Sequence, residues 1–420
     1  MPNNHSLPVE IVYQIISHYI DISSDSVINC KNIVHLAPMN HSLLSQLLKL
    51  RLVNSTWSLA VLPYAYNSIR FNSTSMISCF INNWKHSSII STASRVRSLT
   101  FDQVDYPAFQ SESALKSIGQ ASTSSRYLAC LRYKFDQPVI PMTIVEEALH
   151  LCHDTLSDLK LNFDSPVSFT PQFIRIVERT PNLTALIIVG NTRGFQINHS
   201  ESIRDLLNAA THLVSLSLHL IFLRPLNLKP ASLPHLQHLS LTCNSYNSKA
   251  FVQLCQNHGN DIRCLEAFAH ENRDHISKVV LSLQHSLEIL FLESIPDLLP
   301  TDIQTEIFPK LKVIRTIDVI HTRSGLSWLN YEIFQNVHTF VASFWHSHDH
   351  YRAGLEAIED RLLTKPITFK DIVFVMNNQE AKQGEDKSLS EMFKRHDVYC
   401  HFTSKCTFPD LIVSTSKRLD

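Results

Sequence analysis

Residues 183–188, LTALII, set the pattern that decides the fold of most of this chain. Leu183 stands three positions before Leu186, and Ile188 stands two positions after it. Residues two apart on a β-strand point to the same face of a sheet, so Leu186 and Ile188 are expected to enter one core. The same spacing returns in LVSLSL at residues 213–218, which predicts a repeated strand rather than a single one.

Ten copies of this pattern run from Val96 to Ala342. Their first positions are 23 to 32 residues apart. The average step is roughly 27 residues, within the range of about 20–29 that is typical of leucine-rich repeats. The marked positions are Val96/Leu99/Phe101, Leu128/Leu131/Tyr133, Leu156/Leu159/Leu161, Leu183/Leu186/Ile188, Leu213/Leu216/Leu218, Leu236/Leu239/Leu241, Ile262/Leu265/Ala267, Leu287/Leu290/Leu292, Leu311/Ile314/Thr316 and Val337/Phe340/Ala342.

Helical patterns fill the spaces between the copies. A strand followed by a helix, repeated, forms a parallel sheet whose helices lie outside it. No single repeat can bury its own leucines, so neighbouring repeats must stack. We therefore expect an α/β fold, a curved leucine-rich-repeat solenoid with parallel strands and outer helices; a leucine-rich α/β domain without repeats is the alternative. The helical segments are 144–149, 173–178, 203–207, 251–254 and 276–280.

Two regions depart from this alternation. The short step after the copy at 213–218 contains Pro225, Pro230 and Pro234, which leaves little room for a helix. After Phe344 the pattern fades into segments that are expected to close the open end of the solenoid as a cap. The predicted elements there are a helix over 355–363, a strand over 367–375, a polar loop over 377–387 and a short helix over 390–395.

The N-terminal segment is helical instead. Pro8 suits the first turn of a helix, where its missing N–H costs nothing, and Ile11 and Ile15 follow at helical spacing. LRLVNSTW at residues 50–57 carries a second apolar face, and YNSIRF at 66–71 predicts a strand. Helices this short bury only part of such a surface, so the rest needs a partner or the domain that follows.

These three pieces, in this order, resemble the F-box of fungal F-box proteins, and the repeats resemble the divergent leucine-rich repeats found behind such F-boxes. The F-box resemblance covers roughly the first sixth of the chain. It departs from the family where a short acidic turn would join the two helices, because residues 21–42 intervene here.

The resemblance implies the substrate-recognition subunit of an SCF-type cullin–RING ubiquitin ligase. Its partners would be a Skp-type adaptor, through the adaptor a cullin, and a protein substrate. The adaptor-binding residues that the resemblance implies are Leu7, Pro8, Ile11, Ile15, Leu50, Val53 and Trp57.

The resulting domain plan has three parts. Residues 1–71 would be the F-box-like helical domain with its insertion at 21–42, residues 72–343 the solenoid, and residues 344–420 degraded repeats and the C-terminal cap. Two other interpretations stay open. The N-terminal helices would be only a cap on the repeats, or the chain would be a leucine-rich-repeat scaffold that binds proteins without any ubiquitin role, which the insertion favours.

The residues between the buried leucines of each strand are expected to point to the concave face of the solenoid. In the later copies two phenylalanines stand there beside charged residues, a composition typical of protein interfaces. The alternative is that C-terminal segments fold back and cover them. The predicted substrate-binding residues are Glu266, Phe268, Phe291, Glu293 and Arg315.

Composition narrows the class of protein. The 420 residues carry a net charge of −1, which favours neither nucleic acid nor an anionic membrane as a partner. Nine cysteines without a Cys-x-x-Cys pair fit a reducing compartment better than a disulfide framework. No apolar run approaches the about 20 residues that span a bilayer, and no signal-peptide pattern is present. We therefore expect an intracellular protein, cytoplasmic or nuclear.

Two histidine clusters are the candidates for chemistry. WHSHDH at residues 345–350 could ligate a transition metal, but a polar loop without cysteine ligands is expected there. LHLCHD at 149–154 offers a Cys/His pair, but it lies at an expected helix end, where histidine favours the dipole. The sequence has no Walker loop and no Gly-x-Ser-x-Gly or His-Glu-x-x-His motif. We expect no catalytic residue, metal or cofactor, and no enzymatic activity.

Overall fold

The computed structural model describes residues 7–23, 41–86, 95–105, 139–163, 167–190, 200–269, 274–296, 299–319, 325–358 and 361–403. The described residues up to His235 form one compact unit, and those from Leu236 onward form another. Strands and helices alternate in both units, so the class is α/β, as the sequence predicts.

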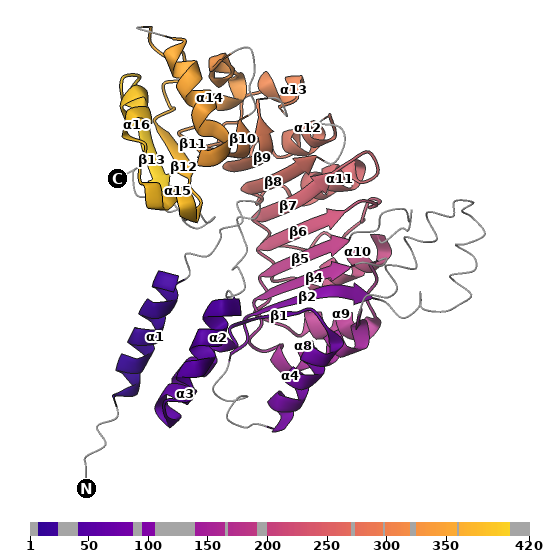
Figure 1. The fold of residues 1–420 in the computed structure, drawn as a ribbon. Coiled ribbons are helices and arrows are strands. Elements are labelled where there is room, and N and C mark those ends of the chain that lie inside the picture. Colours follow the sequence, from indigo (N-terminus) through magenta and orange to yellow (C-terminus); the bar gives the residue numbers. More distant parts are fainter. Residues whose placement is uncertain are drawn as a thin grey trace, which may run out of the picture. The chain divides into compact units, whose positions relative to one another are not determined.

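The first unit begins with three helices and continues with a parallel sheet (Figure 1). The strands pair in the order β1-β2-β4-β5-β6, and β3 pairs with the end of β2. The elements in chain order are α1 (Val9–Ser23), α2 (His41–Leu50), α3 (Ser55–Ala65), β1 (Ser68–Phe71), α4 (Thr74–His86), β2 (Ser98–Asp105), β3 (Ile140–Pro141), α8 (Met142–Cys152), β4 (Asp158–Phe163), α9 (Pro171–Glu178), β5 (Ala185–Gly190), α10 (Ser200–Ala209) and β6 (Ser215–Leu220).

The second unit has the same alternation, and its strands pair in parallel in chain order from β7 to β13. Its elements are β7 (His238–Cys243), α11 (Ser248–His258), β8 (Cys264–Ala269), α12 (Asp274–Leu281), β9 (Ile289–Ile295), α13 (Thr301–Gln304), β10 (Val313–Val319), the 3-10 turns η2 (Ser327–Asn330) and η3 (Glu332–Phe334), β11 (Thr339–Ser343), α14 (Phe344–Glu356), β12 (Asp371–Val375), α15 (Asn378–Gln383), α16 (Lys387–Lys394) and β13 (Tyr399–Thr403).

The marked leucines of the repeats form a continuous core within each unit. Leu159 lies opposite Leu186, and Leu186 lies opposite Leu216 on the next strand. In the second unit Leu239 lies opposite Leu265 in the same way. All five side chains are buried, because each strand covers the leucine of its neighbour. Helices α4, α8, α9 and α10 pack beside one another in that order, as outer helices of a repeat array should.

One predicted repeat does not take its expected place. The copy Leu128/Leu131/Tyr133 lies outside the described residues, and β2 pairs directly with β4, with Leu99 opposite Leu159. Because β2 pairs with β1 along one edge and with β4 along the other, no further strand lies beside Leu99 in this sheet. The prediction that ten copies follow one another in the sheet is therefore wrong at this step. The other nine copies coincide with β2 and with β4 to β11.

The helices between the repeats are predicted well, whereas the C-terminal elements are predicted only in part: β12 and α16 match the expected strand and short helix, but the helix expected over 355–363 is absent from the described residues there, since α14 ends at Glu356. All five predicted repeat helices are present, as α8 to α12, and the proline-containing residues 221–237 contain no helix. The expected polar loop at 345–350 is part of helix α14, because Tyr351 of that helix packs against the rings of Trp328 and Phe374. Helix α15 lies in the expected loop at 377–387, and β13 extends the sheet beyond the expected last strand.

Gly190, at the end of β5, is a position where added volume should be costly. A Cβ atom there would lie 2.8 Å from Cδ2 of Leu220 and 3.2 Å from Cγ2 of Val167, and both neighbours are buried. We expect Gly190→Ala to lower the free energy of unfolding by about 1–3 kcal/mol, since the core must shift to accept a methyl group. Urea unfolding measures the change, and an unaltered midpoint would contradict this packing.

Candidate protein-interaction surfaces

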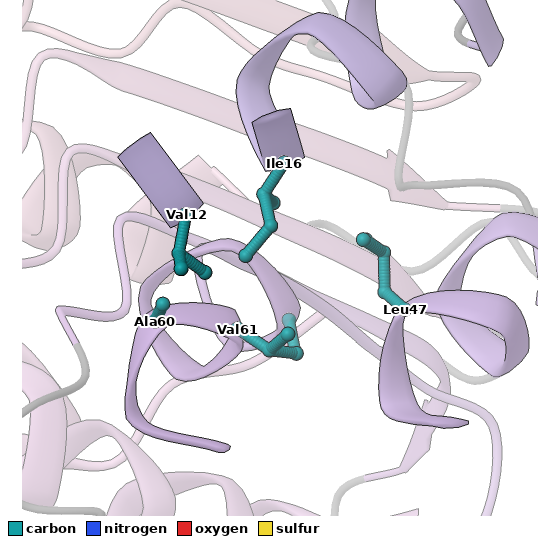
Figure 2. Close-up of a cluster of buried hydrophobic side chains, with 6 residues drawn as sticks. Val12, Ile16, Leu47, Ala60 and Val61 are labelled. Atoms are coloured by element: carbon teal, nitrogen blue, oxygen red, sulfur yellow. The ribbon is translucent and has the colours of Figure 1, made fainter. Parts of the chain in front are cut away.

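Helices α1, α2 and α3 pack around a small core of their own. Val12 and Ile16 come from α1, Leu47 from α2, and Ala60 and Val61 from α3. Figure 2 shows these side chains converging between the three helices. The four-residue spacing of Val12 and Ile16 puts both on one face of α1, so that face is committed to the core.

The turn between α2 and α3 is held in place on both sides. The side-chain oxygen of Asn54 accepts a hydrogen bond of 3.0 Å from the backbone N–H of Trp57, which caps the start of α3. The half-buried side chains of Leu50 and Trp57 pack against the core. Leu52, with 86 % of its surface exposed, and the exposed Val53 therefore stand on an anchored turn.

A second set of exposed apolar side chains lies on α1. Ile11 and Ile15 are one helical turn apart, both are exposed, and Leu7 and Pro8 are exposed just before the helix. Of the seven predicted adaptor-binding residues, five are thus exposed, while Leu50 and Trp57 are half-buried against the core. Together with Leu52, the large apolar side chains among them form a set that we call the α1–α3 apolar surface; its members are Leu7, Ile11, Ile15, Leu52 and Val53.

Other exposed apolar side chains of these helices were not singled out from the sequence. They are Val9 on α1, Leu48 on α2 and Leu59 on α3. Their apolar character is visible in the sequence. The sequence does not show which face of each helix packs into the core, because these helices carry apolar residues on both faces. Only the packing of the three helices decides which face is buried.

In the second unit, four of the five predicted substrate-binding residues come together on neighbouring strands. Glu266 of β8 lies opposite Phe291 of β9, and Phe291 lies opposite Arg315 of β10. The Arg315 guanidinium carbon lies 5.4 Å from the centre of the Phe291 ring, within the range of a cation–π contact. The rings of Phe268 and Phe291 meet edge to face with their centres 5.3 Å apart.

The five predicted substrate-binding residues differ in their exposure to solvent. Glu266 is 1 % exposed and Arg315 is 2 % exposed, and Phe291 is fully buried. Phe268 and Glu293, two residues further along their strands and therefore on the same face, are half-buried. A partner that approaches this face would therefore meet Phe268 and Glu293, while the three enclosed residues hold the strands together.

The Glu266 carboxylate is held in its charged form. His238 Nε2 lies 3.5 Å from Glu266 Oε1, at the outer limit of a hydrogen bond, so the attraction is mainly electrostatic. Burial by itself would raise the pKa of Glu266, but His238, Arg315 and the Ser240 hydroxyl together lower the pKa below its ordinary value of 4.5. A buried anion beside a buried cation is thus present at neutral pH.

The same face of the second unit carries a buried apolar cluster that was not predicted. Its members lie on five different strands, from β8 to β12, and they alternate with the leucines of the repeats along those strands. The repeat pattern assigns these positions to the face away from the leucine core, so their burial could not be expected from that pattern. The cluster comprises Cys264, Ile289, Val313, Val341 and Val375, with Val373 packed against it.

Histidines of both clusters make local packing contacts. The His150 and His153 rings stack with their centres 5.5 Å apart, and His153 Nδ1 lies 2.8 Å from the carbonyl oxygen of His150. The His348 ring stacks on Phe344, one turn earlier in α14, while His350 is buried. Among the described residues, no group of three His, Cys, Asp or Glu side chains is arranged to hold a metal ion.

The cysteine between the first two histidines is in the wrong environment for a nucleophile. Cys152 is buried, and burial raises the pKa of its thiol to about 12. The thiolate is the nucleophilic form, so at neutral pH Cys152 is protonated and unreactive.

This difference in environment predicts an order of reactivity among the cysteines. Cys79 is exposed, whereas Cys152 is buried and protonated. We expect iodoacetamide to modify Cys79 at least about 100-fold faster than Cys152 under native conditions. Mass spectrometry of the peptides after short pulses measures both rates. Equal rates would show that Cys152 is accessible and ionised, and would revive the nucleophile hypothesis.

No helix within the described part of the chain has both the length and the apolar character needed to cross a bilayer. Comparison with known proteins adds no relative: no protein-family model and no curated protein matches the sequence.

Proposed function

We propose that this protein is the substrate-recognition subunit of an SCF-type cullin–RING ubiquitin ligase. The α1–α3 apolar surface would bind a Skp-type adaptor, and through it a cullin, while the repeats hold a protein substrate. The observation that carries the proposal is the exposure of Leu7, Ile11, Ile15, Leu52 and Val53 on helices that already have a packed core.

The physical argument rests on where the apolar side chains lie. The buried core of α1–α3 is formed by other side chains, among them Val12, Ile16 and Leu47, and the exposed set is not part of it. Burying one such side chain is worth about 1.5–3 kcal/mol, which a partner with a complementary surface would gain on binding. A contiguous patch of exposed apolar side chains marks an interaction surface, and the proposal is that these five side chains form one.

The repeats would contribute position rather than chemistry. A stacked array of parallel strands presents a long surface to a partner protein. Holding a substrate near a ubiquitin-loaded enzyme raises the effective concentration of its lysines, and this is how a receptor without reactive groups accelerates transfer. The proposal places the protein in the cytoplasm or nucleus, where free cysteines stay reduced.

Assembly of the complete ligase tests the proposal. Purified full-length protein is mixed with purified Skp-type adaptor and the N-terminal half of a cullin, and the mixture is separated by size. Co-elution of all three, with no cullin bound when the adaptor is left out, is the expected result. Absence of the ternary complex from well-folded protein would instead favour a scaffold without a ubiquitin role.

A further inference from the structure

Strand β13 is the last strand in the pairing order of the second unit, and one of its edges is open. It pairs in parallel with β12, from Tyr399 opposite Asp371 to Thr403 opposite Val375. Among the described residues, no other strand pairs with it. An open edge is a template on which a further strand can add.

The open edge presents the backbone groups of two residues. The N–H of Tyr399 and the carbonyl oxygen of Thr403 both bond to residues that flank β12. Successive residues of a strand direct their backbone groups to opposite edges, so Cys400 and Phe402 direct theirs away from β12. Within the described part of the chain, these two N–H and two C=O groups have no hydrogen-bond partner.

Strand β13 lacks the sequence features that keep edge strands from pairing. Natural edge strands carry prolines, lysines or bulges that prevent another strand from adding. The sequence of β13, YCHFT, contains no proline and no lysine, and its register with β12 runs through all five residues without a bulge. This composition fits a strand whose second edge is covered.

The leucine core of the second unit also ends at β13. Cys400 lies opposite Ile372 and Phe402 lies opposite Phe374, so both side chains are on the core face. The Phe402 ring packs on the rings of Phe344 and Phe374, with centres 5.7 Å apart in each pair. Phe374 is fully buried, but Phe402 is only half-buried. Apolar side chains on a further strand would complete its burial.

The chain continues from β13 into a short apolar run. Leu411, Ile412 and Val413 begin two residues after Pro409, and residues 404–409 separate β13 from Asp410. Isoleucine and valine favour strands. Six residues are enough for the turn between antiparallel strands, whereas a parallel strand needs a crossover of about a dozen residues or more. The length of this connection therefore allows only an antiparallel strand beside β13.

We infer that residues 410–414 add to the open edge of β13 as an antiparallel strand, with Leu411 opposite Phe402 and Val413 opposite Cys400. The N–H groups of Leu411 and Val413 donate to the carbonyl oxygens of Phe402 and Cys400, and accept their N–H groups in return through their own carbonyl oxygens. The added strand closes this edge to strands of other proteins. The inference goes beyond the proposed function and does not depend on it.

The side chains select this register over its neighbours. A shift by one residue would turn Leu411 and Val413 to the opposite face and leave only Ile412 toward the core. A shift by two residues would place either Pro409 or Val413 opposite Phe402. The first loses a hydrogen bond because proline has no N–H, and the second leaves Leu411 in the turn.

Hydrogen exchange of the full-length protein tests the inference with a matched pair of variants. Val413→Pro removes the N–H that bonds to Cys400, whereas Ile412→Pro removes an N–H that points away from β13. We expect the amides of Cys400 and Phe402 to exchange at least about 100-fold faster in Val413→Pro than in the unaltered chain, and within about threefold of the unaltered chain in Ile412→Pro. Mass spectrometry that resolves single amides measures the rates.

Two results of this experiment would overturn the inference. Unchanged exchange of Cys400 and Phe402 in Val413→Pro would show that residues 410–414 do not cover the edge. Equally fast exchange in both variants would show that the backbone of Val413 has no special place beside β13.

The mass of the protein in solution identifies the source of the added strand. Size-exclusion chromatography with light scattering is expected to give the mass of a monomer for the chain whose edge amides exchange slowly. Slow exchange that occurs only in a dimer would assign the strand to a second copy and overturn the inference.

Discussion

Replacing both Ile11 and Ile15 by aspartate should weaken binding of a Skp-type adaptor at least about 100-fold while the chain stays folded. Both side chains are exposed on α1 and take no part in the core that Val12 and Ile16 form with α2 and α3. Full burial of an aliphatic side chain contributes about 1.5–3 kcal/mol, and Ile11 and Ile15 have 40 % and 43 % of their surface left to bury. The two aspartates add the cost of burying unpaired carboxylates, and together these effects reach the about 2.7 kcal/mol that corresponds to 100-fold. Titration calorimetry with the purified adaptor measures the change.

A matched control separates loss of this surface from a general effect of added charge. Met76, on α4, has the same exposed fraction as Ile15, 43 %, and lies outside α1–α3. We expect Met76→Asp to bind the adaptor as tightly as the unaltered chain. Full affinity in the Ile11→Asp, Ile15→Asp double variant would place adaptor binding elsewhere, or remove it from this protein.

Replacing Glu266 by alanine should lower the free energy of unfolding of the second unit by about 3–5 kcal/mol. The substitution leaves the Arg315 guanidinium buried, with 2 % of its surface exposed, without the anion that accompanies it. Urea unfolding followed by tryptophan fluorescence reports the loss. Glu293→Ala is the matched control, since Glu293 lies on the adjoining strand but is half-buried; we expect a change within about 0.5 kcal/mol.

A double variant distinguishes the effect of leaving one buried charge without its partner from the effect of losing side-chain volume. Replacing Glu266 and Arg315 together by methionine removes both charges and keeps apolar volume, which often restores stability where a single replacement does not. We expect this double variant to be more stable than Glu266→Ala. If the double variant is less stable than Glu266→Ala, the two charges stabilise the fold mainly through contacts with other groups and not through their mutual attraction.

The contribution of Glu266 also has a defined pH dependence. Its pKa in the folded chain lies below the ordinary value of 4.5, so the unfolded chain binds a proton more readily than the folded chain does. The stabilisation is therefore fully present above about pH 4.5 and is lost as the pH falls through the folded-state pKa. The difference in stability between the unaltered chain and Glu266→Gln should shrink over that acidic range.

The repeats could be predicted from sequence because their leucines obey a short-range rule. The spacing of Leu186 and Ile188 determines which side chains share a face of a strand, and the chain repeats it often enough to fix the strand positions. The rule failed at Leu128/Leu131/Tyr133, where the spacing recurs by itself but β2 pairs with β4. Spacing within a segment carries no information about which strands become neighbours.

The C-terminal elements and the site were harder to predict, for a different reason. Residues 345–350 are polar in sequence, and α14 forms there because Tyr351 and its neighbours pack among aromatic rings from distant strands. The sequence correctly placed Glu266, Phe291 and Arg315 on adjoining strands, but it could not give their burial. Packing of that kind depends on contacts between residues far apart in the chain.

The most direct test of the proposed function is a binding measurement between two purified proteins. The full-length chain and a Skp-type adaptor are mixed and passed over a size-exclusion column with light-scattering detection. The proposal predicts a single species with the mass of a one-to-one complex. Two separate peaks, each with the mass of a free protein, would contradict it and leave α1–α3 as an apolar surface for some other partner.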